Sequence, residues 1–304
     1  MKKQARDIKE WGKIKPFFDK TYSFNSLDIE TIDNELFLIG CNDHFNGEYI
    51  PIFDNFFYNF NEFLITSLQT KHDILTWTRY DNTQLLKLIL QNTKHATNFK
   101  EIIEKVGKIT PILSYEHNDF TITLLNIIRD TMIFQIIDFN GRAKNIIIYN
   151  LKNLFQGDLV STTKEYNIPY SKLGDEYHII DKNRFYSDLE YKKGVLLSNK
   201  MDGQVLPQIA YKLLDSFKQL TGRVPKSIFS NGSLARSYLL SMFGTSGSKM
   251  LQFKSMFSEH EKSNYKKWFL LLDYSMKSYF GGKIDSYVIG NVGNANVIDI
   301  TSAY

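Results

Sequence analysis

The chain has 304 residues, of which 43% are hydrophobic and 14% aromatic, and its formal net charge is +4. This composition excludes an intrinsically disordered chain, and the charge is too small to identify a nucleic-acid-binding protein. Cys41 is the single cysteine, which excludes an intrachain disulfide and a cysteine-rich zinc site. The N-terminus lacks the pattern of a signal peptide, and no apolar stretch approaches the ~20 residues of a membrane-spanning helix. We therefore expect an intracellular, cytoplasmic protein without membrane contact.

The first third of the chain predicts short strands followed by helices. Residues 1–20 are charged and predict an N-terminal arm, and Asp33-Asn34 is a turn signal between two apolar runs. The period-2 and apolar runs predict strands at residues 24–29, 35–41, 49–53 and 72–78. Apolar residues at helical spacing predict helices at residues 57–68 and 82–91.

The rest of the chain predicts further strands and then helices. Asn140-Gly141 is a hairpin turn signal, and residues 156–196 are polar without a clear period. Strands are expected at residues 120–128, 132–139, 145–149 and 297–300. Helices are expected at residues 99–106, 205–220 and 232–243, the second of them ending at Thr221-Gly222. This order predicts an α/β protein with a mixed sheet and a domain boundary near Gly222.

Two carboxylates lie within the first predicted strand. Asp28 and Glu30 are two residues apart, so on a strand they point to the same face. Two unpaired carboxylates on a largely apolar strand would be costly to bury, and metal ligation is one compensation. A solvated strand face explains the same pattern.

Two further carboxylates lie at predicted helix starts. Asp81 follows the strand at 72–78 and opens a helix, where Asp is also a good N-cap. Asp202 precedes the apolar stripe that begins at Val205, where an acidic residue near a helix start is equally favourable. Each of these two positions has an ordinary structural explanation.

In chain order, the four carboxylates resemble the metal-binding set of the DEDD superfamily of 3′–5′ exonucleases, which are built on an RNase H-like sheet. The segments SLDIET and TRYDN look like the first two exonuclease motifs of family B DNA polymerases. The resemblance implies that Asp28, Glu30, Asp81 and Asp202 bind two Mg²⁺ or Mn²⁺ ions. Such ions activate a water and stabilise the leaving 3′ oxygen, and oxygen ligands suit them.

The sequence departs from this family in two motifs. The third motif usually carries Tyr four residues before its Asp, and the residue here is Ser198. The second motif usually carries Asn ahead of its Asp, and the residue here is Trp77. SKLGDEYH resembles a segment of protein-primed family B polymerases in which a lysine supports the metal site, which would be Lys172, although a solvated loop lysine is the alternative.

The C-terminal segment resembles the start of a family B polymerase domain. Tyr279, Gly281 and Gly282 match a Tyr-x-Gly-Gly motif that helps to handle the template strand. Asp299, Ser302 and Tyr304 match polymerase motif A, in which the Asp binds metal and the other two lie near the nucleotide. A plain Gly-Gly loop and a strand ending in a polar turn are the alternatives.

The resemblance implies an N-terminal arm at 1–20, an exonuclease-like domain at 21–222, and connecting helices with a truncated palm at 223–304. We expect the proofreading exonuclease of a protein-primed, phage- or plasmid-encoded polymerase, without polymerase activity in this chain alone. The expected partners are the single-stranded primer 3′ end, the template, a terminal protein or the missing polymerase portion. A non-catalytic DNA-binding fragment of a split or decayed polymerase, and an unrelated RNase H-like nuclease, are the alternatives.

Overall fold

The computed structural model describes residues 21–93 and 111–243, except for 129, 178 and 226. The described elements up to Met242 belong to one compact unit that begins at Phe17. The expected N-terminal arm, the helix at 99–106 and the strand at 297–300 lie outside the described residues. The same holds for the candidate site residues Tyr279, Gly281, Gly282, Asp299, Ser302 and Tyr304.

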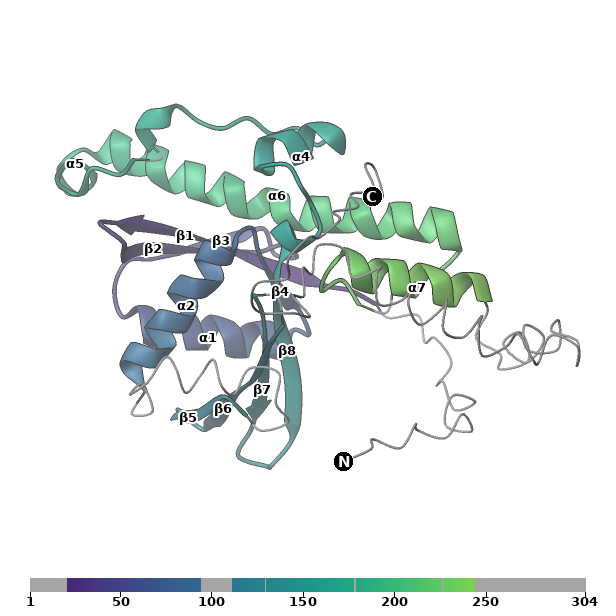
Figure 1. Ribbon diagram of the computed structural model, residues 1–304. Helices are drawn as coiled ribbons and strands as arrows, with labels where there is room; N and C mark the ends of the chain where they lie inside the picture. The colour runs from purple at the N-terminus through teal and green to yellow at the C-terminus, as the bar shows by residue number, and fades with distance from the viewer. Residues whose placement is uncertain (1–20, 94–110, 129, 178, 226, 244–304) are drawn as a thin grey trace, which may run out of the picture. The chain divides into compact units, whose positions relative to one another are not determined.

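An eight-stranded mixed sheet forms the centre of the fold (Figure 1). Its strands are β1 (Phe24–Ile32), β2 (Glu35–Asp43), β3 (Glu48–Ile52), β4 (Asp73–Thr76), β5 (Leu113–His117), β6 (Phe120–Ile128), β7 (Thr131–Ile137) and β8 (Ala143–Asn150). Their order is β3-β2-β1-β4-β8-β7-β6-β5; β1 is parallel to β4 and β4 to β8, and the other neighbours are antiparallel. The predicted mixed α/β class is therefore confirmed, and the antiparallel meander beside parallel strands is consistent with an RNase H-like fold.

The turn between β1 and β2 shows why the first strands were predictable. Asp33 and Asn34 have φ angles of 51° and 64°, the left-handed conformation that a two-residue hairpin turn requires at both central positions. Ile32 pairs with Glu35 across this turn, which fixes the register of the hairpin. The pairing places Asp28 opposite Gly40 on β2.

Helices cover both faces of the sheet. They are α1 (Phe56–Gln69), α2 (Arg79–Asn92), α4 (Leu159–Glu165), α5 (Lys182–Ser187), α6 (Leu189–Thr221) and α7 (Asn231–Phe243), with 3₁₀ turns η2 (Leu151–Asn153) and η3 (Asp175–Tyr177). Gly222, at φ 71°, ends α6 in the predicted place. None of the described helices is both long and apolar enough to cross a membrane.

The description of residues 156–196 as irregular was wrong. This segment contains α4, η3, α5 and the first turns of α6. The three α-helices begin at side-chain caps rather than at a hydrophobic stripe, because Asp158, Asp181 and Asp188 each accept a backbone N–H of the first turn. β5 was also missed, since its five residues carry no clear alternation.

Helix α6 begins earlier than the apolar stripe indicated, so Pro207 lies in its interior rather than near its start. A proline there has no N–H for the carbonyl four residues earlier, which is that of Gly203. The hydroxyl of Ser26 on β1 donates a 2.6 Å hydrogen bond to this carbonyl oxygen. The proline is therefore accommodated by a bond that ties α6 to the sheet.

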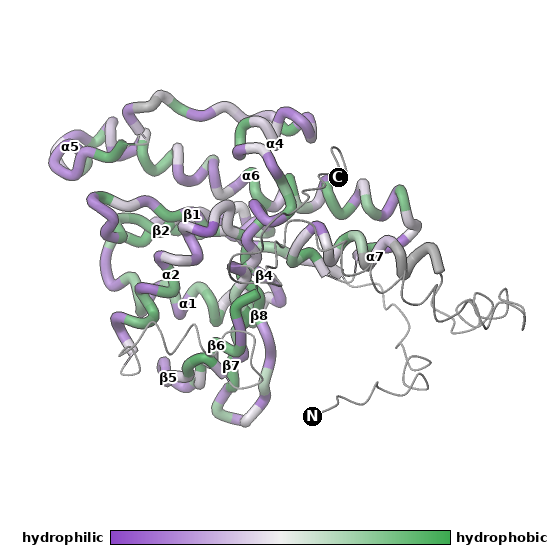
Figure 2. The backbone as a smooth tube through the Cα atoms, in the orientation of Figure 1, coloured by the Kyte–Doolittle hydropathy of each residue, from purple (hydrophilic) through white to green (hydrophobic). Residues whose placement is uncertain are grey.

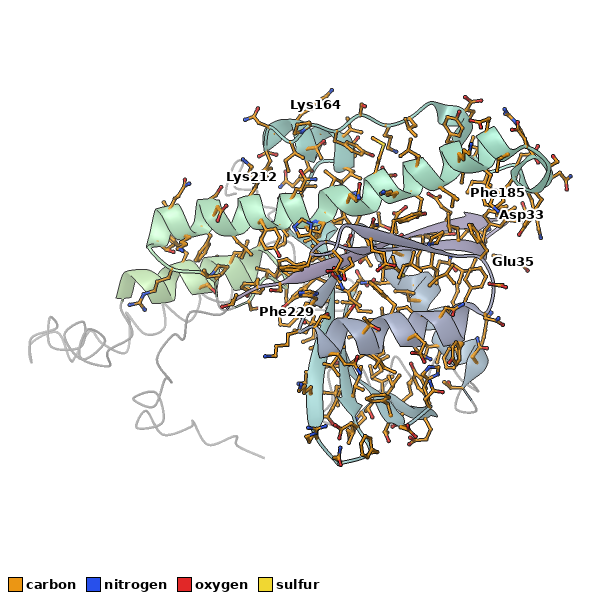
Figure 3. All side chains as sticks on the ribbon, turned by 180° about the vertical axis from the view of Figure 1, so that it is seen from behind. Asp33, Glu35, Lys164, Phe185, Lys212 and Phe229 are labelled. Atoms are coloured by element: carbon orange, nitrogen blue, oxygen red, sulfur yellow. The ribbon has the colours of Figure 1, made fainter. Side chains whose placement is uncertain are left out.

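The side chains of β1 alternate between two apolar layers. Leu27 and Ile29 pack in the cluster that contains residues of α1 and α2, whereas Phe24 packs with Val205 and Leu206 of α6. Figure 2 shows hydrophobic residues along the strands and on parts of α6. A third cluster joins Phe37 of β2 to Phe185 of α5, which lies near the β1–β2 turn in Figure 3. The face of β1 that carries Phe24, and by alternation Ser26, Asp28 and Glu30, is therefore covered by α6.

Candidate active site

Asp28 and Glu30 lie together on the α6 face of β1. The side-chain amide of Asn199 on α6 donates a 2.8 Å hydrogen bond to Oδ2 of Asp28 and a 3.5 Å bond to Oε1 of Glu30. One amide group reaches both carboxylates, so they share a face, as the period of the strand predicts. Both side chains remain partly exposed to solvent.

Asp81 lies in the first turn of α2, just beyond the end of β4. The N-cap of this helix is Thr78, three residues before Asp81. The prediction that Asp81 itself could be the N-cap was therefore wrong. Asp81 forms the other half of a capping box: its Oδ2 accepts the Thr78 N–H at 2.8 Å, and its own N–H donates to the Thr78 hydroxyl at 3.3 Å. The side chain is 4% exposed.

Asp202 approaches from the long helix α6. One oxygen of its carboxylate, Oδ1, accepts a hydrogen bond from the hydroxyl of Tyr170, which lies in the connection between α4 and η3. Burial raises the pKa of Tyr170, and the Asp202 carboxylate raises it further, so this hydroxyl is the proton donor. Asp202 is partly exposed.

The fold places these four carboxylates close enough for the charges of the other three to act on Asp28. Burial raises the pKa of Asp28 well above its usual range, and the charges of Glu30, Asp81 and Asp202 raise it further. A hydrogen bond between the Asp28 and Glu30 carboxyl groups adds to this effect. Burial also raises the pKa of Glu30 to about 7 and that of Asp81 to about 6. Like charges at short range cannot all ionise, so the free site retains protons.

The donor set suits a hard divalent cation, because all four side chains offer carboxylate oxygens. Among the residues that the structure describes, no three His, Cys, Asp or Glu side chains stand close enough to form a ready-made metal site. The carboxylates already take part in hydrogen bonds: with the Asn199 amide, between Asp28 and Glu30, and within the capping box of Asp81. A cation would therefore have to displace a proton, as carboxylate ligands require.

Asn199 is the functional residue that sequence reasoning missed. It is fully buried, and its Oδ1 accepts a 2.9 Å hydrogen bond from the hydroxyl of Tyr49 on β3. Gly40 makes room for it, since a Cβ at that position would lie 1.6 Å from Asn199 Oδ1. The available signal was its spacing of three residues before Asp202, which places both on one helical face.

The remaining sequence candidates are placed differently. Ser198 is buried at 2% exposure, and Trp77 is buried at 8%. Lys172 is exposed, and its charge is one of the smaller influences that lower the pKa of Asp158, after the backbone N–H of Ser161. The structure thus brings Asp28, Glu30, Asp81 and Asp202 together and associates Lys172 with a carboxylate outside this set.

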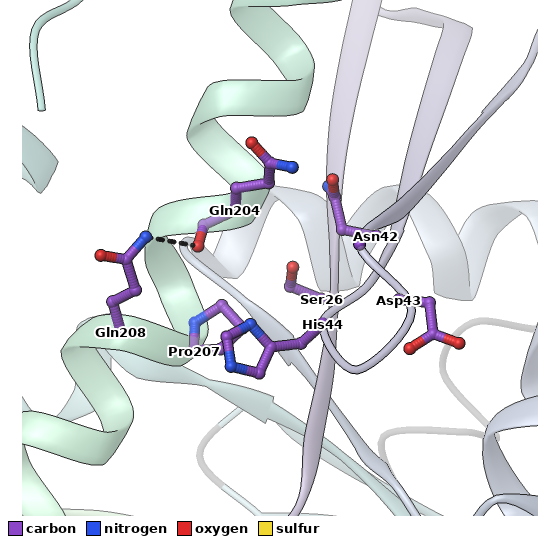
Figure 4. Close-up of a pocket in the computed structure, with 8 residues that line it drawn as sticks. Ser26, Asn42, Asp43, His44, Gln204, Pro207 and Gln208 are labelled. Carbon is purple, nitrogen blue, oxygen red and sulfur yellow. Dashed lines mark hydrogen bonds between the residues drawn. The ribbon is translucent and has the colours of Figure 1, made fainter.

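A pocket of about 260 Å³ lies between β1, α6 and the end of β2 (Figure 4), and none of the four carboxylates is among its lining residues. The lining comes from β1, from the end of β2 with the turn that follows it, and from α6: Ser26, Asn42, Asp43, His44, Gly47, Gln204, Pro207 and Gln208. Ser26 precedes Asp28 by two residues, so the pocket lies along the same face of β1. Asn42 is 2% exposed, and neither of its amide atoms has a hydrogen-bond partner.

The sequence matches no protein-family profile, and a comparison with curated proteins finds no match. Several solved structures share part of the fold, among them two of phi29 DNA polymerase. The post-translocation binary complex with primer–template DNA has a TM-score of 0.42 and 14% identity, over 71% of this chain and 34% of that chain. The ternary complex with DNA and incoming nucleotide has a TM-score of 0.45 and 14% identity, over 74% and 35%. The chain thus spans about a third of the polymerase's length, and a similarity of this size assigns no activity to it.

Proposed function

We propose that the described part of the chain is the metal-dependent 3′–5′ exonuclease region of a family B DNA-directed DNA polymerase. One observation carries this proposal: the charges of Glu30, Asp81 and Asp202, which come from three distant segments, all raise the pKa of Asp28. The long helix α6, the first strand and the start of α2 supply these carboxylates from segments far apart in the chain. Burial is the largest cause of the raised pKa values of Asp28, Glu30 and Asp81, and no basic group is among the main causes of these three shifts. Strongly shifted carboxyl groups of this kind are typical of a functional site.

The reaction would be hydrolysis of the terminal phosphodiester of a DNA strand. Mg²⁺ or Mn²⁺ held by the four carboxylates would supply an activated water and stabilise the leaving 3′ oxygen. The chain's own residues prepare this site: Asn199 orients Asp28 and Glu30, and the capping box orients Asp81. These hydrogen bonds restrict the carboxylate rotamers before any ligand arrives.

The proposed substrate is a single-stranded primer 3′ end. Tyr80, adjacent to Asp81, is 42% exposed, and its hydroxyl lies 2.8 Å from the hydroxyl of Thr31 at the end of β1. An exposed aromatic ring at the position before Asp81 is a surface on which a terminal base can stack without sequence preference. The small net charge is compatible with this substrate, because only the groove that holds the strand needs to be basic.

The polymerase part of the proposal is supported by sequence resemblance alone. It concerns Tyr279, Gly281 and Gly282 as template-handling residues, Asp299 as a metal ligand, and Ser302 with Tyr304 as nucleotide-binding residues. A terminal protein as a partner, and a role in DNA replication, follow from the same resemblance to protein-primed enzymes.

A second candidate function is a non-catalytic DNA-binding module. The observation that favours it is the position of Asn199, whose amide engages both Asp28 and Glu30 in an arrangement that contains no ready-made metal site within the described residues. Ser198, in place of the tyrosine of the family's third motif, points the same way. Binding of DNA without cleavage would be the expected property.

The deciding experiment measures mononucleotide release from a 5′-labelled single strand in Mg²⁺ or Mn²⁺. The Asp28→Asn/Glu30→Gln variant removes the ligand charges with little change of shape. Its matched control is Asp33→Asn/Glu35→Gln, an exposed pair with the same spacing at the β1–β2 turn. We expect the first variant to lose cleavage and the second to retain it.

Three outcomes distinguish the candidates. Metal-dependent shortening from the 3′ end, stopped by a 3′-terminal phosphorothioate linkage, supports the exonuclease. Equal cleavage by both variants contradicts the metal-site assignment. Retention of the strand on a gel, with no cleavage by the wild-type protein in either metal, supports the DNA-binding module.

A further inference from the structure

We propose that Tyr170 is a positioning residue for Asp202, an inference that rests on the proposed function of the four-carboxylate site. Its hydroxyl donates a hydrogen bond to Oδ1 of Asp202 across 32 residues of sequence. The tyrosine lies neither on α6 nor on any strand, but in the connection between α4 and η3. Tyr170 is therefore a loop residue in a site whose carboxylates come from two helices and a strand.

The position of the Tyr170 ring is determined by packing on α6. The ring is partly buried against the apolar cluster that contains Val205, Leu206 and Ile209. Two residues earlier, Ile168 is buried in the same cluster, and its N–H bonds to the Thr163 carbonyl at 2.9 Å. The connection is thus anchored immediately before the tyrosine, which limits where the hydroxyl can lie.

The hydroxyl acts on Asp202 because it occupies one carboxylate oxygen. A hydrogen bond to Oδ1 restricts the rotamer of the Asp202 carboxylate, so the direction of this ligand is set before a cation binds. Donors of this kind orient metal ligands, and their loss commonly weakens metal binding or activity by about 10- to 100-fold. Ser198, one helical turn before Asp202, is buried and has only a short side chain. Tyr170 therefore supplies to Asp202 a tyrosine hydroxyl that comes from outside α6.

The test is Tyr170→Phe, which removes the hydroxyl and keeps the ring. The matched control is Tyr166→Phe, a half-buried tyrosine of the same connection whose ring packs on Phe155. Mn²⁺ binding to the full chain without DNA, measured by electron paramagnetic resonance of free Mn²⁺, should weaken by about 10- to 100-fold in Tyr170→Phe and stay unchanged in the control. The half-saturating Mn²⁺ concentration for cleavage should rise by the same factor, with the KM for DNA unchanged.

A double-mutant comparison with Asp202→Asn shows whether Tyr170 acts through Asp202 or through general packing. In an Asp202→Asn background, Tyr170→Phe should have no further effect on Mn²⁺ binding, and thermal unfolding should verify that each variant is folded. The inference would be overturned if Tyr170→Phe left Mn²⁺ binding unchanged, or if it weakened Mn²⁺ binding equally in the Asp202→Asn background. A raised KM for DNA with an unchanged Mn²⁺ dependence of cleavage would also overturn it. A wild-type chain that binds Mn²⁺ but releases no mononucleotide would contradict the proposed function and leave this inference standing.

Discussion

The amide nitrogen of Asn199 lies 2.8 Å from Oδ2 of Asp28, although 171 residues separate them in the chain. The same amide reaches Glu30, and its oxygen accepts the Tyr49 hydroxyl. A neutral donor thus bonds to both carboxyl groups, in a position where an unpaired pair of carboxylates would be costly. This set of hydrogen bonds connects β3, α6 and β1.

Replacing Asn199 by Ala should destabilise the metal-free protein. The variant leaves the Asp28 and Glu30 carboxylates without their amide donor, at an expected cost of about 1–3 kcal/mol in the free energy of unfolding. Urea denaturation at pH 8 with a chelator measures it. Asn183→Ala, at an exposed position on α5, is the control and should stay within about 0.5 kcal/mol of wild type. Equal stability of the two variants would refute a role for this amide.

The stability of the metal-free protein should fall as the pH rises from about 5 to above 7. The pKa of Glu30 is raised from 4.5 to about 7, and that of Asp28 is raised as well. A carboxyl whose folded pKa is raised stabilises the fold when protonated, so this stability is present below the unfolded pKa and lost through the folded pKa. The slope should reach about 1.4 kcal/mol per pH unit for each proton released.

Comparison with Asp28→Asn/Glu30→Gln isolates this effect. The lowered pKa values of His44 and His72 act in the opposite direction and are common to both proteins. The difference in unfolding free energy between variant and wild type should therefore grow as the pH rises. Mg²⁺ should reduce that difference above pH 7, because it binds the ionised carboxylates of the wild-type protein alone. A difference that is constant from pH 5 to 8 would argue against the shifted carboxyl pKa values.

Ser26 and Pro207 should be energetically coupled. Ser26→Ala leaves the buried Gly203 carbonyl without the hydroxyl that donates to it, at an expected cost of about 1–3 kcal/mol. In a Pro207→Ala background the new N–H at position 207 can bond to that carbonyl, so the same substitution should cost less. A double-mutant cycle by urea denaturation should give a coupling of about 0.5–3 kcal/mol. Additive effects would show that the Ser26 hydroxyl does not compensate for the proline.

Gly40→Ala should disturb the site without touching a carboxylate. The added Cβ would lie 1.6 Å from Asn199 Oδ1 and 2.9 Å from the Tyr49 ring, so Asn199 must move. We expect a loss of about 1–3 kcal/mol in stability and a higher cation requirement for cleavage. Gly232→Ala is the control, because its nearest atom, Ser230 Oγ, is 3.7 Å away. Wild-type cation dependence in Gly40→Ala would show that the position of Asn199 is not critical.

Local patterns in the sequence determined much of the sheet and the composition of the site. The Asp33-Asn34 turn set the first hairpin, because few residues adopt two successive left-handed conformations. The strand period then placed Asp28 and Glu30 on one face, since alternation is a property of the extended backbone itself. Elements without a hydrophobic period, such as α4 and α5, left no comparable signal and were missed.

Only the tertiary structure decided which groups meet. Helical spacing indicated that Asn199 and Asp202 share a face, but not that this face lies against β1. The register of α6 on the sheet is determined by packing of Val205 and Leu206 and by the bond from Ser26 to Gly203. Tyr170 reaches Asp202 because a loop packs on the same helix. The period of a helix or strand predicts which face a side chain occupies. The residue that it contacts on a neighbouring element depends on packing between segments far apart in the chain.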